Sequence, residues 1–237
     1  MKILHVTDLH LTPRWFEWLI DASPRSDVVC ISGDLLDRES PLPHVAQVEL
    51  ASAWLRRFDR PLCVCSGDHD LEWDARYECW RKARWLSETL ALNVHGDGSV
   101  FDLHGERIHS VSLTTYPKGL PADIWVVHAP PAGLAVGREY AGPDFGEPSM
   151  VDTIARLRPK VVLCGRVHEP ASWFERQDGV MYLNPGCLRT ARFPNHILLD
   201  TESFEARRVV DCALGAHSET ARWTATFDDP TEQLAIA

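Results

Sequence analysis

The sequence predicts an α/β fold in which two sheets pack face to face with helices on the outside. Short apolar runs alternate along the chain with segments of helical periodicity, which is typical of a layered α/β protein. Residues 93–112 and 173–199 change to shorter, alternating patterns, which indicates antiparallel strands added at the sheet edges. A chain of 237 residues with 45% hydrophobic residues is long enough for one such core.

Five apolar runs are predicted as buried strands, because they are short and end in polar or Gly-containing residues. They span residues 3–6, 28–31, 62–65, 124–127 and 161–164. Three segments have helical spacing. The first contains Val48, Ala51, Ser52, Leu55 and Phe58, the second Val151, Ile154, Ala155 and Leu157, and the third Trp73, Tyr77, Trp80 and Arg84. The third has two interpretations: an aromatic, basic face that stacks on nucleotides, or an amphipathic helix that packs its rings inward.

We predict one domain over residues 1–212 and a peripheral tail over residues 213–237, because the pattern weakens after Asp211. A formal net charge of −10 argues against a protein that coats nucleic acids, since that binding depends on Lys and Arg. The sequence has neither a recognisable secretory signal nor an apolar stretch long enough to span a bilayer. We therefore expect a cytoplasmic protein without a membrane partner.

The chain contains seven cysteines, and four of them lie within or beside the predicted strands. These are Cys30, Cys63, Cys65 and Cys164. A thiolate metal cluster usually has paired CxxC spacing, which these residues lack. We expect them to be reduced core residues.

Carboxylates and histidines follow each of the five predicted strands. The segments are DLH (8–10), GDLLD (33–37), GDHD (67–70), HAPP (128–131) and GRVH (165–168). Any one of them is more simply explained as a helix cap or a structural histidine. Strand ends gather at one edge of an α/β sheet, however, so together these segments predict a metal site. Carboxylate oxygens mixed with imidazole nitrogens suit Mn, Fe or Zn better than Ca or Mg.

This order of motifs resembles that of the calcineurin-like metallophosphoesterases, whose motifs are DxH, GDxxD, GNH followed by an acid, a lone His, and GHxH. The resemblance covers roughly residues 1–200 and includes Pro170 and the NPG sequence at 184–186. It implies a four-layer αββα sandwich, with two packed mixed sheets flanked by helices, around a two-metal centre. It also implies a phosphatase or phosphodiesterase that uses a metal-activated water.

By this resemblance, Asp8, His10 and His168 are ligands of the first metal, and Asp34 bridges both metals. The second metal would take the residues that correspond to Asp34, Asp68, His128 and Arg166. Two of these depart from the family pattern, because Asp68 replaces an Asn and Arg166 replaces a His. Arginine stays protonated and has no lone pair, so Arg166 is not expected to coordinate.

Three alternatives follow for Arg166. We favour a guanidinium–carboxylate pair with Asp68, which places a fixed positive charge near the position of the second metal and stabilises a phosphate oxygen. The second alternative keeps a second metal on Asp34, Asp68 and His128, with Arg166 turned toward the substrate. The third is a solvated residue at a strand end. One complete metal site and a doubtful second site are therefore expected.

His69 is the candidate general acid for the leaving oxygen, oriented or made more basic by Asp70. The alternative is a phosphate-contacting or supporting histidine. Asp37 is expected to support the ligands rather than to bind metal. Residues 133–149 are either a lid over the metal or a plain surface loop, so Arg138 and Tyr140 are candidate substrate contacts.

The leading function is a phosphomonoesterase or phosphodiesterase that acts on a small or nucleotide-like substrate. One alternative is a catalytically weak binding module on the same scaffold, indicated by the altered second site. The other is a nuclease, which the aromatic 73–85 segment favours and the acidic net charge opposes.

Overall fold

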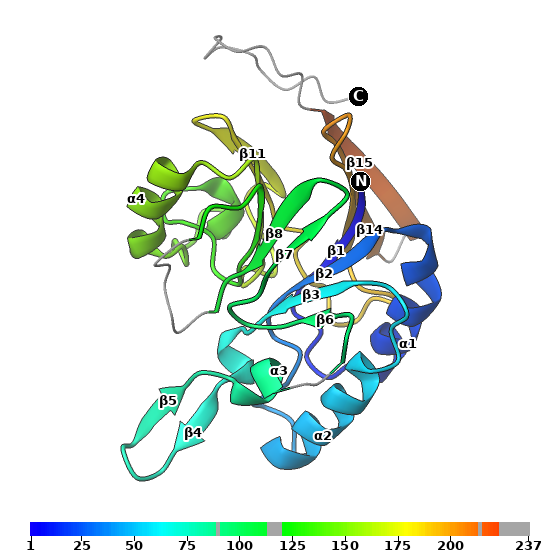
Figure 1. The fold of residues 1–237 in the computed structure, drawn as a ribbon, viewed down its shortest axis with the longest axis vertical. Helices are drawn as coiled ribbons and strands as arrows, with labels where there is room; N and C mark the ends of the chain where they lie inside the picture. Colours follow the sequence, from blue (N-terminus) through cyan, green and yellow to red (C-terminus); the bar gives the residue numbers. More distant parts are fainter. Residues whose placement is uncertain (89–90, 113–119, 213–214, 223–237) are drawn as a thin grey trace.

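The computed structural model describes residues 1–88, 91–112, 120–212 and 215–222, which form two mixed sheets and one separate hairpin (Figure 1). The sheets lie face to face, with α1, α2 and α3 outside the first sheet and α4 outside the second. This arrangement confirms the predicted four-layer αββα sandwich.

The first sheet has seven strands in the order β15-β14-β13-β1-β2-β3-β6. These strands are β1 (Lys2–Val6), β2 (Val28–Ser32), β3 (Leu62–Cys65), β6 (Val94–His95), β13 (His196–Asp200), β14 (Glu205–Cys212) and β15 (Gly215–Arg222). Strands β1, β2, β3 and β6 run parallel, whereas β13, β14 and β15 add in antiparallel fashion. β15 carries the sheet past the predicted boundary at residue 212, while 213–214 and 223–237 of the predicted tail lie outside the described residues.

The second sheet has six strands in the order β11-β12-β10-β9-β8-β7. They are β7 (Val100–Leu103), β8 (Glu106–Ser110), β9 (Ile124–Val126), β10 (Val161–Leu163), β11 (Phe174–Gln177) and β12 (Val180–Leu183). Strands β8, β9, β10 and β12 are parallel, and β7 and β11 close the two edges in antiparallel fashion. The antiparallel additions expected from the sequence are therefore confirmed in both sheets.

The helices cover the outer faces with apolar side chains. They are α1 (Pro13–Ala22), α2 (His44–Leu55), α3 (Arg84–Glu88) and α4 (Pro148–Leu157). Trp15 and Trp54 pack on the first sheet, and Ile154 packs on the second. A third apolar cluster lies between the sheets and contains Cys30, Cys63 and Cys65. Central strands buried on both faces explain why the sequence shows continuous apolar runs rather than alternation.

The four cysteines predicted in the core are buried free thiols. Burial raises the pKa values of the Cys63 and Cys65 thiols well above the ordinary range. The protonated thiol is therefore the favoured form, which agrees with the prediction of reduced core residues.

The predicted helix over residues 73–85 is wrong. Residues in this segment form the hairpin of β4 (Glu72–Asp74) and β5 (Cys79–Arg81), followed by the short helix α3. Asp74 Oδ1 accepts hydrogen bonds from the backbone N–H groups of Arg76 and Tyr77, which closes the turn. Trp73 and Trp80 are cross-strand partners, so their spacing of seven comes from the hairpin register rather than from a helix face.

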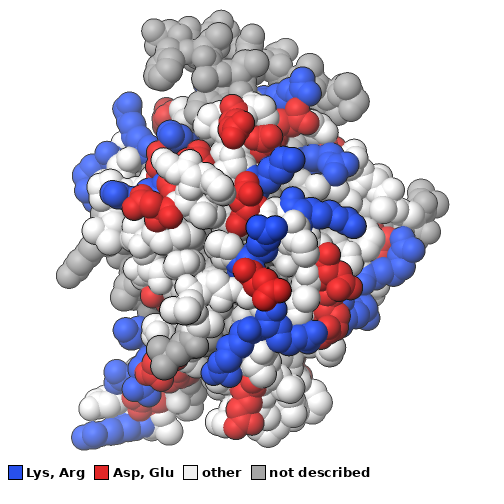
Figure 2. All heavy atoms as spheres, turned by 45° about the vertical axis from the view of Figure 1, so that its right-hand side comes forward, with Lys and Arg blue, Asp and Glu red and all other residues white. Residues whose placement is uncertain are grey.

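The surface carries both signs of charge. On the face in Figure 2, Lys and Arg side chains are interspersed with Asp and Glu side chains, and neither sign covers a broad area. Within the described residues, no helix combines the length and the apolar character that crossing a bilayer requires.

Candidate metal centre

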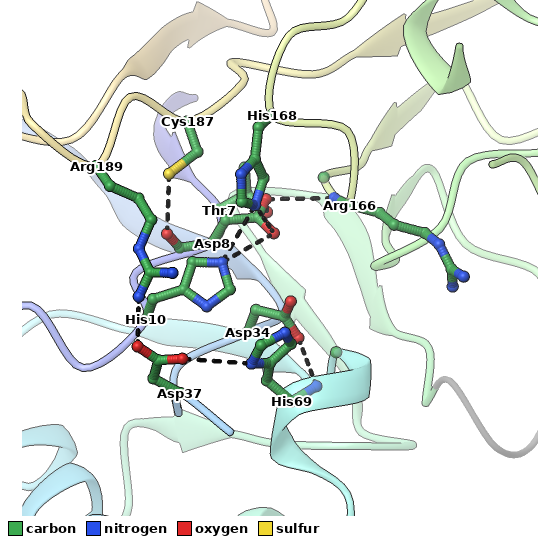
Figure 3. A network of polar contacts seen from close by, with 12 residues as sticks. Thr7, Asp8, His10, Asp34, Asp37, His69, Arg166, His168, Cys187 and Arg189 are labelled. Atoms are coloured by element: carbon green, nitrogen blue, oxygen red, sulfur yellow. Dashed lines mark hydrogen bonds and ion pairs between the residues drawn. The ribbon is translucent and has the colours of Figure 1, made fainter. Parts of the chain in front are cut away.

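The five predicted ligand segments meet at the carboxyl ends of parallel strands from both sheets, and residues of four of them are labelled in Figure 3. Asp8 follows β1 and Asp34 follows β2, while Asp68 and His69 lie in the 3₁₀ turn η2 (Asp68–Asp70) after β3. The second sheet contributes His128 after β9 and residues 165–168 after β10. The sequence-based expectation that these loops converge is therefore confirmed.

Asp8, His10 and His168 form the first candidate cation site. Asp8 Oδ1 lies 3.5 Å from His168 Nε2 and 3.9 Å from His10 Nε2, and the two Nε2 atoms are 3.2 Å apart. This carboxylate oxygen is buried and has no hydrogen-bond partner among the described residues. A buried oxygen that faces two imidazole nitrogens fits a divalent transition metal, because an unpaired buried carboxylate is otherwise costly.

The other oxygen of Asp8 is fully engaged. Oδ2 accepts hydrogen bonds from the Thr7 hydroxyl at 2.6 Å and from the Arg166 backbone N–H at 3.2 Å. Burial raises the pKa of Asp8, but the His168 contact and the nearby imidazoles outweigh it and lower the pKa to about 2. Burial lowers the pKa of His10 to about 4, which favours the neutral imidazole that a metal requires.

Asp34 lies between this site and a second group of ligands. Its Oδ1 accepts a hydrogen bond from the His69 backbone N–H at 2.9 Å, and its Oδ2 lies 3.5 Å from His128 Nε2. Burial, reinforced by the charges of Asp8 and Asp68, raises the pKa of Asp34 to about 6. Asp34 groups with His10 and His69 in one candidate cation site and with Asp8 and His128 in another, and its bridging role stays a prediction.

His128 is oriented from behind by the main chain. Its Nδ1 lies 2.8 Å from the Ser32 carbonyl oxygen and donates to it, which directs Nε2 toward Asp68 Oδ1 at 3.2 Å. Burial opposes the charged imidazole, but the Asp34 and Asp68 carboxylates raise the pKa of His128 to about 10. Two carboxylates around one nitrogen place a positive charge there, whether it is carried by a proton or by a cation.

The predicted ion pair between Arg166 and Asp68 is not among the ion pairs of the described residues. Asp68 Oδ2 instead lies 3.7 Å from Arg38 Nη1, and the hydrogen bond with His128 holds the pKa of Asp68 well below its usual range. Arg166 is fixed by its backbone contact to Asp8, and its side chain extends away from His10 and His69 (Figure 3). Its charge still contributes to the low pKa of Asp68.

The predicted contact between Asp70 and His69 is also wrong. The Asp70 carboxyl points inward and accepts hydrogen bonds from the backbone N–H groups of Leu36 and Gly67, at 2.9 and 2.8 Å. It therefore ties the loop after β2 to the turn after β3. His69 Nδ1 accepts a hydrogen bond from the Arg38 backbone N–H at 3.0 Å and lies 3.7 Å from Asp37 Oδ1.

Arg189 is a site residue that the sequence reasoning missed. It pairs with Asp37 and lies beside His10 (Figure 3). Its position three residues after the NPG sequence is the only signal that pointed to it. The two Asp37 oxygens are directed at Arg189 and His69, a geometry that is compatible with the expected supporting role of Asp37.

Three glycines allow the ligands to approach one another. A Cβ atom on Gly165 would lie 1.8 Å from Thr7 Oγ1, and one on Gly67 would lie 2.0 Å from Asp34 Oδ1. A Cβ atom on Gly33 would lie 2.4 Å from His128 Nδ1. The Gly that precedes Asp34, Asp68 and Arg166 is therefore a steric requirement of the site.

The backbone is also strained at three candidate ligands and at Arg166. Asp8, His10, Asp34 and Arg166 all have positive φ, between 42° and 68°. Such conformations cost non-glycine residues about 1–3 kcal/mol each and tend to cluster at functional sites. The surrounding hydrogen bonds hold these residues in place at that cost.

Asn184 supports the loop that carries Arg166 and His168. Its side chain is fully buried, and its amide group donates to the carbonyl oxygens of Val136, Gly165 and Val167, at 3.0 to 3.2 Å. Its Oδ1 accepts a hydrogen bond from the Gly186 N–H at 2.8 Å. One residue thus joins three chain segments behind the metal centre.

We expect Asn184→Asp to lower the free energy of unfolding by about 2–4 kcal/mol, because a carboxylate oxygen would face three carbonyl oxygens in a buried site. Urea denaturation followed by circular dichroism measures this loss. Asp102→Asn is the matched control, since Asp102 is exposed on β7 and pairs with Arg107 on its neighbour strand. A loss below about 0.5 kcal/mol at residue 184 would contradict the supporting role.

The candidate substrate contacts Arg138 and Tyr140 are both exposed on the surface. Their loop is not detached, because the Ala171 N–H donates to the Arg138 carbonyl oxygen at 2.7 Å and Glu139 bridges to Pro170. The loop therefore packs beside the segment that follows His168. The substrate role of these two residues stays a prediction.

A cavity of about 460 Å³ lies elsewhere, between α1 and strands β13 and β14, and Trp18, His196 and Arg207 are among its lining residues. It shares no residue with the ligand cluster. The chemistry of the donor set, rather than cavity size, identifies the candidate active site.

Comparisons with known proteins agree with this geometry. The model of the calcineurin-like phosphoesterase family matches residues 1–170. A comparison with curated proteins gives no match.

Several solved structures share the fold. An archaeal phosphodiesterase is 19% identical, with a TM-score of 0.52 over 89% of this chain and 99% of the other. Vps29 from Entamoeba histolytica, complexed with zinc, is 15% identical, with a TM-score of 0.51 over 94% and 99%. A protein from Thermus thermophilus is 15% identical, with a TM-score of 0.58 over 92% and 97%. At such identities the likeness establishes the fold alone.

Proposed function

Because the chain belongs to the calcineurin-like phosphoesterase family and is a metal-dependent phosphoester hydrolase, we propose that it hydrolyses small phosphomonoesters or phosphodiesters with one tightly held metal ion. The observation that carries this proposal is the convergence of Asp8, His10 and His168 around an unpaired, buried carboxylate oxygen. Asp34 would complete the ligand set. Mn, Fe or Zn suits these donors.

A divalent cation in this position supplies Lewis acidity to a phosphoryl oxygen and lowers the pKa of a water molecule to about 7. The residues of the chain orient these groups. Thr7 and the Arg166 backbone N–H fix Asp8, and the Ser32 carbonyl oxygen fixes His128. These contacts keep donor atoms aimed at one point, so little reorganisation is needed during the reaction.

His69 is proposed to donate a proton to the leaving oxygen. Its Nδ1 accepts the Arg38 backbone N–H, so the neutral ring carries its proton on Nε2. Proton donation to an oxygen requires the imidazolium form, in which Nδ1 also carries a proton, gives up the Arg38 contact and pairs with Asp37 Oδ1, 3.7 Å away. Donation from Nε2 then leaves the neutral ring. The ring lies next to His10, with centroids 4.7 Å apart, which supports a position beside the reacting phosphoryl group. The alternative, in which the same Nε2–H only binds a phosphate oxygen, uses the same geometry.

The second subsite is proposed to bind metal weakly. Asp34, Asp68 and His128 present three donors to it, but Arg166 stands where the family has a fourth. The outward direction of Arg166 supports a contact with substrate phosphate rather than with Asp68. The expected result is one tight and one weak site.

We expect Arg166→His to strengthen binding of a second metal equivalent by at least about 10-fold, because an imidazole adds a ligand and the guanidinium charge is removed. Calorimetric titration of the metal-free protein with Mn²⁺ or Zn²⁺ measures both sites. Arg166→Ala removes the charge without adding a ligand and is the matched control. Equal second-site affinity in these two variants would contradict the missing-ligand explanation.

The proposed function is tested by stripping the protein of metal and restoring Mn, Fe, Zn or Mg singly. Turnover of 4-nitrophenyl phosphate and bis(4-nitrophenyl) phosphate then distinguishes monoester from diester preference, with bound metal quantified in the same samples. Turnover that depends on the metal would support the proposal. A metal-loaded protein without turnover would favour the binding-module alternative.

Three further expectations rest on the sequence alone. A cytoplasmic location, a nucleotide-like substrate and the lack of nonspecific nucleic-acid binding stay predictions. The local argument for the nuclease alternative changes form, because the aromatic segment is a hairpin rather than a helix but its Trp73, Tyr77 and Trp80 rings are exposed.

A further inference from the structure

The β4–β5 hairpin stands apart from both main sheets and follows directly after the turn that carries Asp68 and His69 (Figure 1). It exposes three aromatic side chains: Trp73 is 52% exposed, Tyr77 57% and Trp80 45%. Burying such rings is strongly favourable, so a cluster of exposed ones is typical of a binding surface.

A single arginine connects this hairpin to the metal centre. The Arg38 guanidinium carbon lies 3.7 Å from the centroid of the Trp80 ring, and Arg38 Nη1 lies 3.7 Å from Asp68 Oδ2. The Arg38 backbone N–H also donates to His69 Nδ1. The Arg38 side chain therefore contacts both Trp80 of the hairpin and Asp68 of the candidate metal centre.

The hairpin is anchored rather than loosely attached. Trp85 Nε1 donates to the carbonyl oxygen of Asp70, the last residue of the 3₁₀ turn, at 3.1 Å. Arg84 pairs with Glu72 at 3.5 Å, and Trp73 packs edge-on against Trp80 with centroids 5.1 Å apart. The aromatic surface is thus held at a defined position relative to the metal centre.

We propose that Arg38, Trp80 and Trp73 form a subsite for a planar aromatic group attached to the substrate phosphoryl group, as in a nucleoside phosphoester. This inference rests on the proposed phosphoesterase function and names its substrate class. The Arg38 guanidinium binds a phosphate oxygen while it is held flat against Trp80. The exposed ring surface of Trp80 and Trp73 stacks on the aromatic group.

The charges around the hairpin are mixed. Arg76 and Arg81 lie over the Tyr77 ring, at 5.2 and 4.6 Å, but Arg81 pairs with Asp74 at 2.6 Å. The cation next to the Trp80 ring is Arg38, whose contact with Asp68 is longer, at 3.7 Å. A nucleoside phosphate offers both partners that the subsite needs, a stacking ring and an anion.

The test compares two diesters with the same leaving group: thymidine 5′-(4-nitrophenyl phosphate) and methyl 4-nitrophenyl phosphate. The metal-loaded protein is expected to have a kcat/KM at least about 10-fold higher for the thymidine ester, the scale expected for stacking one base. Trp80→Ala is expected to bring this ratio close to one, and Trp80→Phe to preserve most of it.

Leu50→Ala is the control variant, because Leu50 is an exposed apolar residue on α2, and its ratio should equal that of the parent protein. Equal kcat/KM for the two esters in the parent protein would overturn the subsite while the phosphoesterase function stands. So would a ratio unaffected by Trp80→Ala.

If neither ester is hydrolysed, the proposed phosphoesterase function is contradicted. A binding measurement then still tests the aromatic subsite. Equilibrium dialysis compares thymidine 5′-phosphate with methyl phosphate on the metal-loaded protein. Binding of the thymidine compound at least about 10-fold more tightly, with loss of this preference in Trp80→Ala, supports the subsite. Equal binding of the two compounds overturns it.

Discussion

Asp8→Asn is expected to lower kcat/KM by at least about 1,000-fold, which corresponds to about 4 kcal/mol of transition-state stabilisation. The substitution replaces a carboxylate oxygen that faces His10 and His168 with an amide group. The amide lacks the negative charge of the carboxylate, and its NH₂ group has no lone pair for a metal ion. Steady-state kinetics with a metal-loaded sample measures the loss, and metal analysis should show the tight equivalent missing.

The same variant distinguishes a ligand from a structural residue. Burial raises the pKa of Asp8, but the contacts with His168 and His10 lower it to about 2, so the carboxylate stabilises the folded protein at neutral pH, and the metal-free variant should be less stable than the metal-free parent. Added metal should raise the melting temperature of the parent but not of the variant, which thermal unfolding with metal and with a chelator checks. Asp102→Asn, which changes an exposed carboxylate on β7, should leave the rate and the metal content unchanged. A fully active Asp8→Asn protein would contradict the metal site.

Gly67→Ala is expected to reduce activity by at least about 100-fold, because displacement of a reacting or ligating group by about 1 Å has an effect of that size. The added methyl group would lie 2.0 Å from Asp34 Oδ1 and 2.5 Å from the Asp34 backbone N. The backbone atom cannot turn aside as a side chain can, so Asp34 or the β3 turn must move. Steady-state kinetics and metal titration of the same sample measure this effect, and a joint loss of activity and metal affinity would show that the metal centre is displaced.

Gly105→Ala provides the matched control for this substitution. Gly105 has a φ of +81°, and an added Cβ would meet nothing within 4 Å. It should cost about 1 kcal/mol of stability from backbone strain and leave catalysis unaffected. If both glycine variants retained full activity, the steric explanation for Gly67 would be wrong.

The strands and their ends could be predicted from the sequence with good accuracy. The run at 62–65 coincides with β3, and each of the other four predicted strands differs from the observed bounds by one residue at one end. These strands are buried on both faces, which leaves a strong local signal of apolar residues. The ligand positions could be predicted as well, because the ligands lie directly after strand ends, and the carboxyl ends of neighbouring parallel strands lie at one edge of the sheet.

Contacts between side chains from different loops could not be read in the same way. Asp70 is adjacent to His69 in the sequence, yet the 3₁₀ turn directs it into the core, and Asp37 from another loop approaches His69 instead. Arg38 similarly takes the place at Asp68 that the sequence suggested for Arg166. Such pairings depend on where each turn directs its side chains, which a motif does not record.

The hairpin error has a different origin. A spacing of seven places two residues on one helix face, and it also places Trp73 opposite Trp80 across a turn. The aromatic composition favours the strand, and the Asp74 turn with Glu78 at φ 48° favours the reversal. Helix α1 also carries a local signal, because Pro13 stands in its first turn and Trp15, Phe16 and Leu19 are buried at helical spacing.

The division of the ligands between the two sheets makes the centre sensitive to shear. Asp8, His10 and Asp34 move with one sheet, whereas His128 and His168 move with the other. A small slide of one sheet across the other would separate the donors even if each loop kept its shape. The packing of the apolar side chains between the sheets therefore fixes the relative positions of the ligands. Substitutions in this cluster, although far from the metal, should change turnover even when they are too mild to unfold the protein.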